Sequence, residues 1–172
     1  MGYQYSKEKL GLLTILIINE KKWKKIEYKE ILQILAPCGL NCYKCFANTE
    51  GAIKKTSVKL QKFLGSFDIY AERFSSFLPI FKEYPSFKSL LSYLADENCS
   101  GCRKGSCLYP DCGVRNCYKS KGVDFCFQCD EFPCEKTNFD DHLKRRWKQI
   151  NNRMKEIGVE SYYRETKEIP RY

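Results

Sequence analysis

The sequence predicts an α+β, predominantly helical fold: a small metal-stabilised domain with an irregular cysteine-rich region and short hairpins. Apolar residues recur at helical spacing in several segments of the 172-residue chain, a length that suits one domain. Eight of the 11 cysteines fall between residues 98 and 134. That segment is also rich in glycine and proline, which favours turns over long helices or strands.

The cysteine pattern divides the chain into two parts. Residues 1–34 form an N-terminal extension, and residues 35–172 form a cysteine-rich metal-binding domain. The extension contains an apolar run at residues 10–18, whose periodicity fits a strand or a helix and which is too short to span a bilayer. At the end of the extension, the helical spacing of Ile31, Leu32 and Leu35 predicts a short helix that leads into the first cysteines.

Three helices are expected in the cysteine-free insert over about residues 47–97. Gly65 and Pro79 mark helix ends there, and Ser66 or Asp68 can cap the second helix. Apolar residues at intervals of three and four are expected to face the core. They are Ile53, Val58, Leu60, Leu64, Ile69, Tyr70, Phe74, Phe77, Phe87, Leu90, Leu91 and Leu94.

The clearest helix covers about residues 140–158, after the cysteine-rich knuckle region at residues 98–134. Asp140 or Asp141 can cap its start, and Gly158 can end it. One apolar stripe contains Leu143, Trp147, Ile150, Met154 and Ile157. The other positions are basic and predict a solvated face or, alternatively, a contact surface for an acidic partner; they include Arg145, Arg146, Lys148, Arg153 and Lys155.

The cysteine spacing predicts metal binding. Three pairs have the CxxC spacing, in which a tight turn directs two sulfurs at one point. Disulfides are disfavoured because the cysteine count is odd and no signal-peptide cleavage pattern is visible. With the single histidine, there are twelve potential ligands, enough for three four-coordinate sites. They are Cys38, Cys42, Cys45, Cys99, Cys102, Cys107, Cys112, Cys117, Cys126, Cys129, Cys134 and His142.

Zinc is the favoured metal, as two or three ions, because paired CxxC knuckles in an aromatic setting are typical of zinc sites. Iron–sulfur is the alternative, since Cys38, Cys42 and Cys45 have the C-x3-C-x2-C spacing found in radical S-adenosylmethionine enzymes. The large α/β barrel of those enzymes is not predicted here. His142 is favoured as an exposed residue over a ligand, which leaves the number of sites open.

Four stretches of the sequence resemble the DUF3795 family of small cysteine-rich prokaryotic proteins. These are LAPCGLNCYKC, CSGCR, GVDFCFQCDEFPC and MKEIGVESYY, and the resemblance covers about residues 35–165. It implies a cytoplasmic bacterial or archaeal protein that binds metal. It implies no activity, because the family brings no catalytic residues to carry over.

Together these observations predict a non-catalytic structural or interaction module with an unknown macromolecular partner and no membrane contact. An iron–sulfur redox protein or an S-adenosylmethionine-dependent protein is the first alternative. Nucleic-acid binding through the basic helix at residues 142–155 is the second. The formal net charge of +9 supports it weakly, because metal-bound thiolates would offset part of that charge. No catalytic constellation is visible in the sequence.

Overall fold

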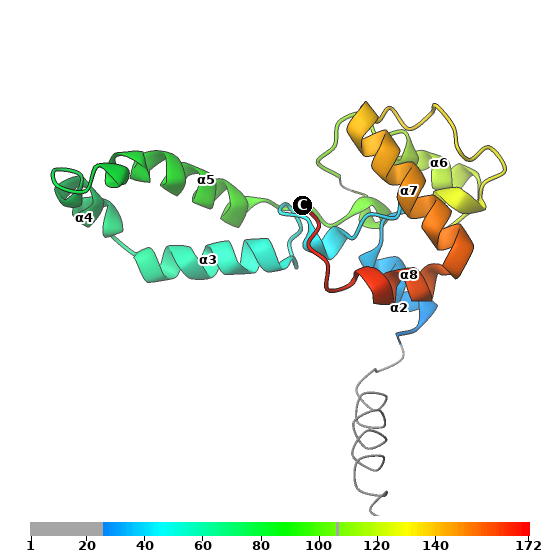
Figure 1. Ribbon diagram of the computed structural model, residues 1–172, viewed down its shortest axis with the longest axis horizontal. Helices are drawn as coiled ribbons and strands as arrows, with labels where there is room; N and C mark the ends of the chain where they lie inside the picture. Colours follow the sequence, from blue (N-terminus) through cyan, green and yellow to red (C-terminus); the bar gives the residue numbers. More distant parts are fainter. Residues whose placement is uncertain (1–25, 106) are drawn as a thin grey trace, which may run out of the picture.

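The computed structural model describes residues 26–105 and 107–172 (Figure 1). The apolar run at residues 10–18 lies outside the described residues, and its strand-or-helix alternatives stay predictions. The described chain is mainly helical. Its α-helices are α2 (Tyr28–Ile34), α3 (Ala52–Leu64), α4 (Phe67–Phe74), α5 (Tyr84–Asp96), α6 (Val114–Ser120), α7 (Asp141–Ile157) and α8 (Val159–Thr166). Short 3-10 turns are η1 (Cys42–Lys44), η2 (Pro79–Glu83), η3 (Cys102–Lys104) and η4 (Cys126–Gln128).

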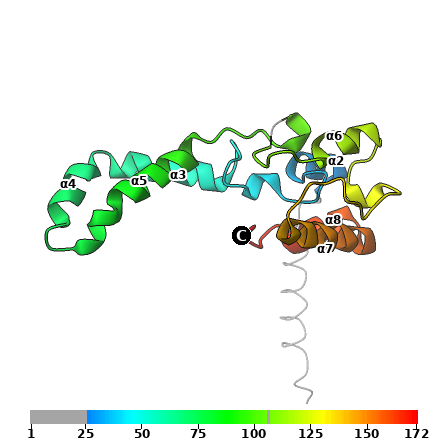
Figure 2. The ribbon, with the colours of Figure 1, turned by 90° about the horizontal axis from the view of Figure 1, so that it is seen from above.

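The helices form two parts, a body and an arm. Figures 1 and 2 show α2, α6, α7 and α8 gathered in the body, with α3, α4 and α5 extending away from it. We call residues 52–96 the arm. At its root, the backbone of Cys99 exchanges hydrogen bonds with the segment that precedes α3: Cys99 N donates to Ala47 O at 2.8 Å, and Thr49 N donates to Cys99 O at 3.1 Å.

The core of the body is built on α7. The predicted cap is present, because the Asp140 side chain accepts a hydrogen bond from Leu143 N at 2.9 Å. Trp147, Ile150 and Met154 on its apolar stripe are buried, as the sequence predicts. They pack with residues of α2, α8 and the cysteine-rich segment: Ile31, Leu35, Ala36, Cys38, Cys102, Val114, Phe125, Val159 and Tyr162.

The arm is an antiparallel helix pair closed by α4. The Gln61 side chain donates to Ser92 Oγ, and the Lys54 side chain donates to the Glu97 carbonyl. Later residues of α3 thus lie beside earlier residues of α5, which makes the two helices antiparallel. α3 ends before Gly65, as predicted. The expectation that the arm's apolar residues form a core is wrong for several of them: Ile69 is 67% exposed, and Tyr70, Phe77, Phe87 and Leu90 are also exposed. A layer two helices wide can bury only the sides that face each other.

The β part of the predicted α+β class is not found. Within the described residues, strand-type pairing is limited to two isolated bridges, Leu35 with Asn41 and Asn48 with Cys99. Instead of hairpins, the knuckle region contains the short helix α6, and a further helix, α8, follows Gly158. Among the residues described, no helix has the length and apolar content needed to cross a bilayer.

Candidate metal centre

The 11 cysteines all lie within the described residues, form no disulfide there, and gather around two cavities in the body. The first, which we call the four-cysteine pocket, is lined by Cys117, Cys126, Cys129 and Cys134. The second, which we call the seven-cysteine cavity, is lined by Cys38, Cys42, Cys45, Cys99, Cys102, Cys107 and Cys112. The two groups follow the order of the chain: the first seven cysteines line one cavity and the last four line the other, with the division between Cys112 and Cys117.

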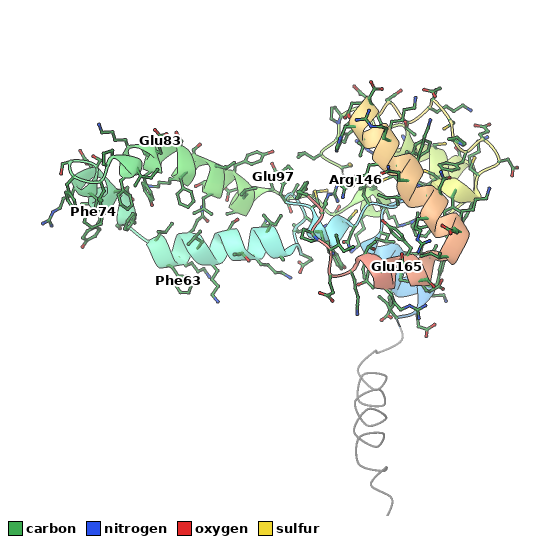
Figure 3. All side chains as sticks on the ribbon, viewed as in Figure 1. Phe63, Phe74, Glu83, Glu97, Arg146 and Glu165 are labelled. Carbon is green, nitrogen blue, oxygen red and sulfur yellow. The ribbon has the colours of Figure 1, made fainter. Side chains whose placement is uncertain are left out.

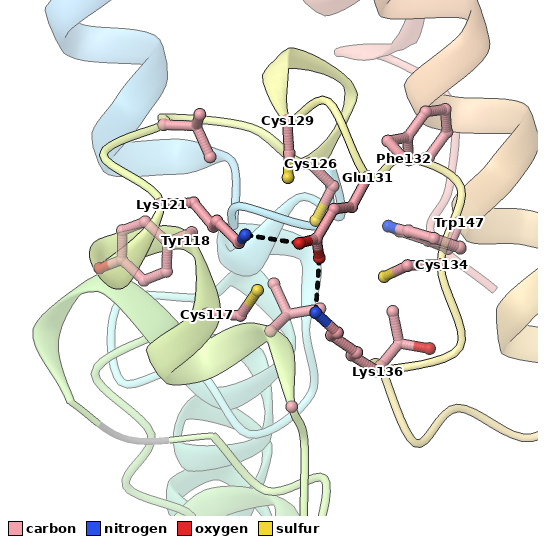
Figure 4. Close-up of a pocket in the computed structure, with 14 residues that line it drawn as sticks. Cys117, Tyr118, Lys121, Cys126, Cys129, Glu131, Phe132, Cys134, Lys136 and Trp147 are labelled. Carbon is pink, nitrogen blue, oxygen red and sulfur yellow. Dashed lines mark hydrogen bonds and ion pairs between the residues drawn. The ribbon is translucent and has the colours of Figure 1, made fainter.

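The four-cysteine pocket is formed by α6, η4 and the segment after η4 (Figure 4). Cys117 lies on α6, while Cys126 and Cys129 flank the η4 turn, in which Cys129 N donates to Cys126 O at 3.1 Å. This is the tight CxxC turn that the spacing predicts. The pocket has a volume of about 30 Å³, enough for one small ion or water molecule.

A close backbone approach holds the segment after Cys134 against α6. Gly113 N donates to Thr137 O at 3.1 Å. A Cβ atom at Gly113 would lie 1.8 Å from the Lys136 carbonyl oxygen, so only glycine permits this approach. The contact holds the segment that follows Cys134 next to the start of α6.

A buried indole N–H faces the four-cysteine pocket. Trp147 on α7 lines the pocket, is 1% exposed, and its Nε1 atom makes no regular hydrogen bond within the described structure. Burial raises the pKa of the Cys126 thiol to about 11, and the Trp147 N–H opposes that rise. A thiolate at Cys126 would give this N–H the acceptor that it lacks.

Two lysines border the same pocket. Lys121 and Lys136 each donate to the Glu131 carboxylate at 2.6 Å (Figure 4). These hydrogen bonds lower the pKa of Glu131 to about 2. The neighbouring Cys117 sulfur contributes to raising the pKa of both lysines, so the cations lie within electrostatic reach of the thiols.

A buried amide connects the two cysteine groups. Asn151 on α7 is fully buried; its Oδ1 accepts from Phe127 N in η4 at 3.1 Å, and its Nδ2 donates to Cys38 O at 3.0 Å. A backbone bond from Cys126 N to Pro37 O at 3.0 Å runs in parallel. The turn that carries Cys126 and the loop that carries Cys38 are therefore held at a fixed separation.

The seven-cysteine cavity is larger, at about 330 Å³. The CxxC pair Cys42 and Cys45 flanks η1, where Cys45 N donates to Cys42 O at 2.9 Å. The loop before it passes close to α7 at Gly39, which has a φ of +87°. A Cβ atom there would lie 2.2 Å from Ile150 Cγ2, so this position requires glycine.

Three thiols from separate segments meet in the seven-cysteine cavity. The Cys102 thiol hydrogen-bonds to Cys42 and lowers the pKa of Cys42 to about 7. It also hydrogen-bonds to Cys107 and lowers the pKa of Cys107 to about 6, while these two contacts raise the pKa of Cys102 itself. Burial raises the pKa of Cys38. These contacts therefore favour the thiolate form at Cys42 and Cys107 over the thiolate form at Cys102.

Residues near the C-terminal end of the chain border the cavity. The Arg171 guanidinium donates to Asn41 O at 2.7 Å and helps to lower the pKa of both Cys42 and Cys107. The Tyr172 hydroxyl donates to Cys45 Sγ at 3.7 Å. Lys44 fixes the preceding segment by donating to Thr166 O at 2.8 Å and Ile169 O at 2.5 Å.

His142, the twelfth predicted ligand, is exposed in the first turn of α7 and lines neither cavity. Among residues 26–105 and 107–172, no three Cys, His, Asp or Glu side chains have the arrangement that would hold a metal ion. The structure therefore gathers the predicted cysteines in two groups without fixing them as ligands, and the metal assignment stays a prediction.

A family model matches residues 34–139, which is more than half of the chain. The chain belongs to the DUF3795 family. The family is described as proteins of unknown function, so membership confirms the resemblance seen in the sequence and brings no activity with it. The match covers all 11 cysteines of this DUF3795 chain. No curated protein and no solved structure matches it.

Sequence reasoning did not identify Trp147 and Asn151 as parts of the site. Trp147 was assigned to the apolar stripe of α7, and only its buried N–H beside Cys126 gives it a polar role. The role of Asn151 could have been inferred from the sequence, because it is a polar residue four positions after Trp147 and next to Ile150 on the same apolar face. An amide in such a position is expected to need buried hydrogen-bond partners.

Proposed function

We propose that this protein binds zinc and that one structural Zn²⁺ is held by Cys117, Cys126, Cys129 and Cys134. The observation that carries the proposal is the four-cysteine pocket itself: four free thiols surround a volume of about 30 Å³. Four thiolates in a tetrahedral arrangement are the ligands of a closed structural zinc site. Because no three of these side chains stand in a metal-binding arrangement within the described residues, the proposal requires the four sulfurs to move towards a common ion when zinc binds.

The surroundings of the pocket support this proposal electrostatically. A zinc ion with four thiolates carries a net charge of −2, and Lys121, Lys136 and the Glu131 carboxylate between them give the border of the pocket a net charge of +1. The Trp147 indole N–H can donate to the Cys126 sulfur and stabilise the thiolate form. These contacts support a bound cation over four partly buried neutral thiols.

The proposed role of the metal is to organise the turn-rich segment at residues 98–134 for contact with another macromolecule. That segment contributes few buried apolar side chains, chiefly Val114 and Phe125. A structural zinc site supplies on the order of 10 kcal/mol of folding free energy, which would compensate for this small core. Zinc-bound, reduced thiols also suit a cytoplasmic location.

Elemental analysis of protein purified without oxygen tests the proposal. We expect at least one zinc per chain, and we expect Cys129→Ser to lose one equivalent. His142→Ala is the control, and it should keep the wild-type zinc content because His142 is exposed and lines neither cavity. Less than one zinc per chain after expression with adequate zinc contradicts the proposal.

The role of Trp147 can be tested on the same preparation. Trp147→Phe keeps the ring but removes the N–H, so zinc content should stay constant while transfer to a chelator becomes about 10-fold faster or more. Phe139→Leu is the control for packing, because Phe139 contacts the Trp147 ring at a centroid distance of 6.2 Å. If zinc moves to the chelator equally fast from Trp147→Phe and Phe139→Leu, the Trp147 N–H does not stabilise the bound zinc.

A second candidate is an iron–sulfur centre in the seven-cysteine cavity, with Cys38, Cys42 and Cys45 as ligands. The observation that favours it is the size of the cavity, about 330 Å³, which exceeds what a single ion needs. It predicts a brown protein with broad absorption near ~400 nm after anaerobic purification. A colourless anaerobic preparation excludes it.

Nucleic-acid binding through α7 receives less support. Arg153 pairs with Glu165 at 2.7 Å and with Glu156 at 2.9 Å. Lys144 pairs with Glu135, and Arg146 donates to the Arg171 carbonyl. Much of the basic face is thus engaged within the chain, and we do not propose this function.

A further inference from the structure

The arm carries a large apolar surface that the rest of the described chain leaves open to solvent. Figure 3 shows Phe63 on α3 and Phe74 at the end of the arm, far from the body. Phe63 is 76% exposed and Leu90 is 59% exposed. Ten large apolar side chains on the arm are exposed: Leu60, Phe63, Ile69, Tyr70, Phe77, Leu78, Ile80, Phe87, Leu90 and Tyr93.

Helical spacing places part of this surface on one side of the arm. In α3, Ser57 is buried, and Leu60 and Phe63 follow at three-residue intervals on one flank of that buried position. In α5, Leu91 is buried, and Leu90 and Phe87 lie on one flank of it. Because the two helices are antiparallel, both flanks lie on the same side of the pair.

We call Leu60, Phe63, Phe87 and Leu90 the apolar face of the arm. By the same helical spacing, the opposite side of the pair carries Lys55, Lys62 and Ser89. A helix pair with one apolar and one polar side resembles half of a four-helix bundle. The sequence pattern is that of a buried interface, although one side of the pair has no covering element in the described chain.

The exposed area is large enough for a stable contact. From their exposed fractions, the ten side chains offer on the order of 1,000 Å² of mostly apolar surface. A specific interface of standard size takes about 800 Å² from each partner. The largest apolar patch on a typical monomer covers only about 300–600 Å². The four side chains of the apolar face supply about 450 Å² of this area, and most of the rest lies towards the far end of the arm, at Ile69, Tyr70, Phe77, Leu78 and Ile80. A dimer contact of standard size would therefore take in both the apolar face and the far end of the arm.

The charges on the arm favour a protein partner over a lipid surface. Asp68 pairs with Lys88 at 3.1 Å, and Glu72 and Glu83 are exposed close to the aromatic end of the arm. Figure 3 shows Glu83 near the same end as Phe74. Insertion of that end into a bilayer would bury these carboxylates. α3 itself carries four lysines and no acidic residue, so binding to anionic vesicles is one of the outcomes that the experiment must separate.

We propose that two copies of this chain associate through their arms, with the apolar faces at the centre of the contact and the exposed side chains of the far ends at its margins, and form a four-helix bundle from two α3–α5 pairs. A two-fold arrangement suits this surface, because the same side chains can then fill both halves of the contact. The bodies and their cysteines remain at the two ends of the bundle. This assembly does not depend on the proposed zinc site.

Light scattering coupled to size-exclusion chromatography, run over a concentration series, tests the proposal on the full chain. The wild type is expected at twice the chain mass of 20.2 kDa. Leu90→Glu should raise the dimer dissociation constant roughly 30-fold or more, as expected for loss of a central apolar contact. Ser89→Glu is the matched control, because it adds the same charge one residue away on the polar side and should leave the dimer unchanged.

Phe63→Glu provides a second variant on the other helix, and glutamate is compatible with helix at both positions. Far-UV circular dichroism checks that each variant keeps its helical content. A wild type that is monomeric at every concentration overturns the proposal, as does a Leu90→Glu, Phe63→Glu double variant that remains dimeric. Co-sedimentation of a monomeric wild type with phosphatidylcholine–phosphatidylglycerol vesicles would assign the face to lipid instead and would also overturn it.

Discussion

Asn151 is expected to be one of the most sensitive positions of the body, and Asn151→Ala measures its contribution. The substitution removes the acceptor of Phe127 N and the donor to Cys38 O, at 3.1 and 3.0 Å. The third bond, from Asn151 Nδ2 to Trp147 O, is a smaller loss because that carbonyl lies within α7. Two backbone groups left unpaired at about 1–3 kcal/mol each, with the small void, give a loss of about 3–5 kcal/mol.

Asn152→Ala is the matched control, because Asn152 is the next residue on α7 and is exposed. It should change the free energy of unfolding by about 0.5 kcal/mol or less. Denaturant unfolding of both variants, followed by circular dichroism in reducing buffer, gives the comparison. If the free energies of unfolding of Asn151→Ala and Asn152→Ala differ by less than about 1 kcal/mol, the Asn151 amide does not connect the two cysteine groups as described.

Two further substitutions test other parts of the structure. Gly39→Ala should cost about 2–4 kcal/mol in thermal or denaturant unfolding, because a Cβ there meets Ile150 Cγ2 at 2.2 Å in addition to the strain of a φ of +87°. Gly65→Ala, at a φ of +50° with no atom within 4 Å, should show only the backbone strain of about 1 kcal/mol; equal losses would contradict the packing described at Gly39. Glu131→Gln should destabilise the protein at neutral pH, since the pKa of Glu131 is lowered to about 2 by Lys121 and Lys136. That stabilisation is complete above the ordinary glutamate pKa of about 4.3 and is lost as the pH falls towards 2, so unfolding curves of the two proteins should converge in acid; a constant difference at every pH would refute the ion pair.

The ends of helices were predicted correctly where a single residue, such as a capping aspartate or a terminating glycine, determines them. Asp140 caps α7 through Leu143 N, and Gly65 ends α3 in a left-handed conformation. The CxxC spacing likewise predicted the tight turns at Cys42–Lys44 and Cys126–Gln128. These features depend on residues fewer than five positions apart, so they are readable without knowledge of the fold.

Features that depend on distant contacts could not be predicted in this way. The cysteines divide between Cys112 and Cys117, which are only five residues apart, and this division follows from how the segments around α6 pack. Ile69 and Phe77 are exposed because the arm extends away from the body. This could not be predicted, since periodicity identifies the apolar side of a helix but not whether another element covers it. α8 was missed because its apolar residues Val159 and Tyr162 are few, although both are buried against the body.

The root of the arm lies in the wall of the seven-cysteine cavity. Cys45 precedes α3 and Cys99 follows α5, and the bridge between Asn48 and Cys99 joins the two ends of the arm. α3 alone, with 13 residues, is about 20 Å long. A tilt of about 3° at this root therefore displaces the far end of that helix by about 1 Å. Because Asn48 and Cys99 both line this cavity, a rearrangement of its wall would change the direction in which the arm points.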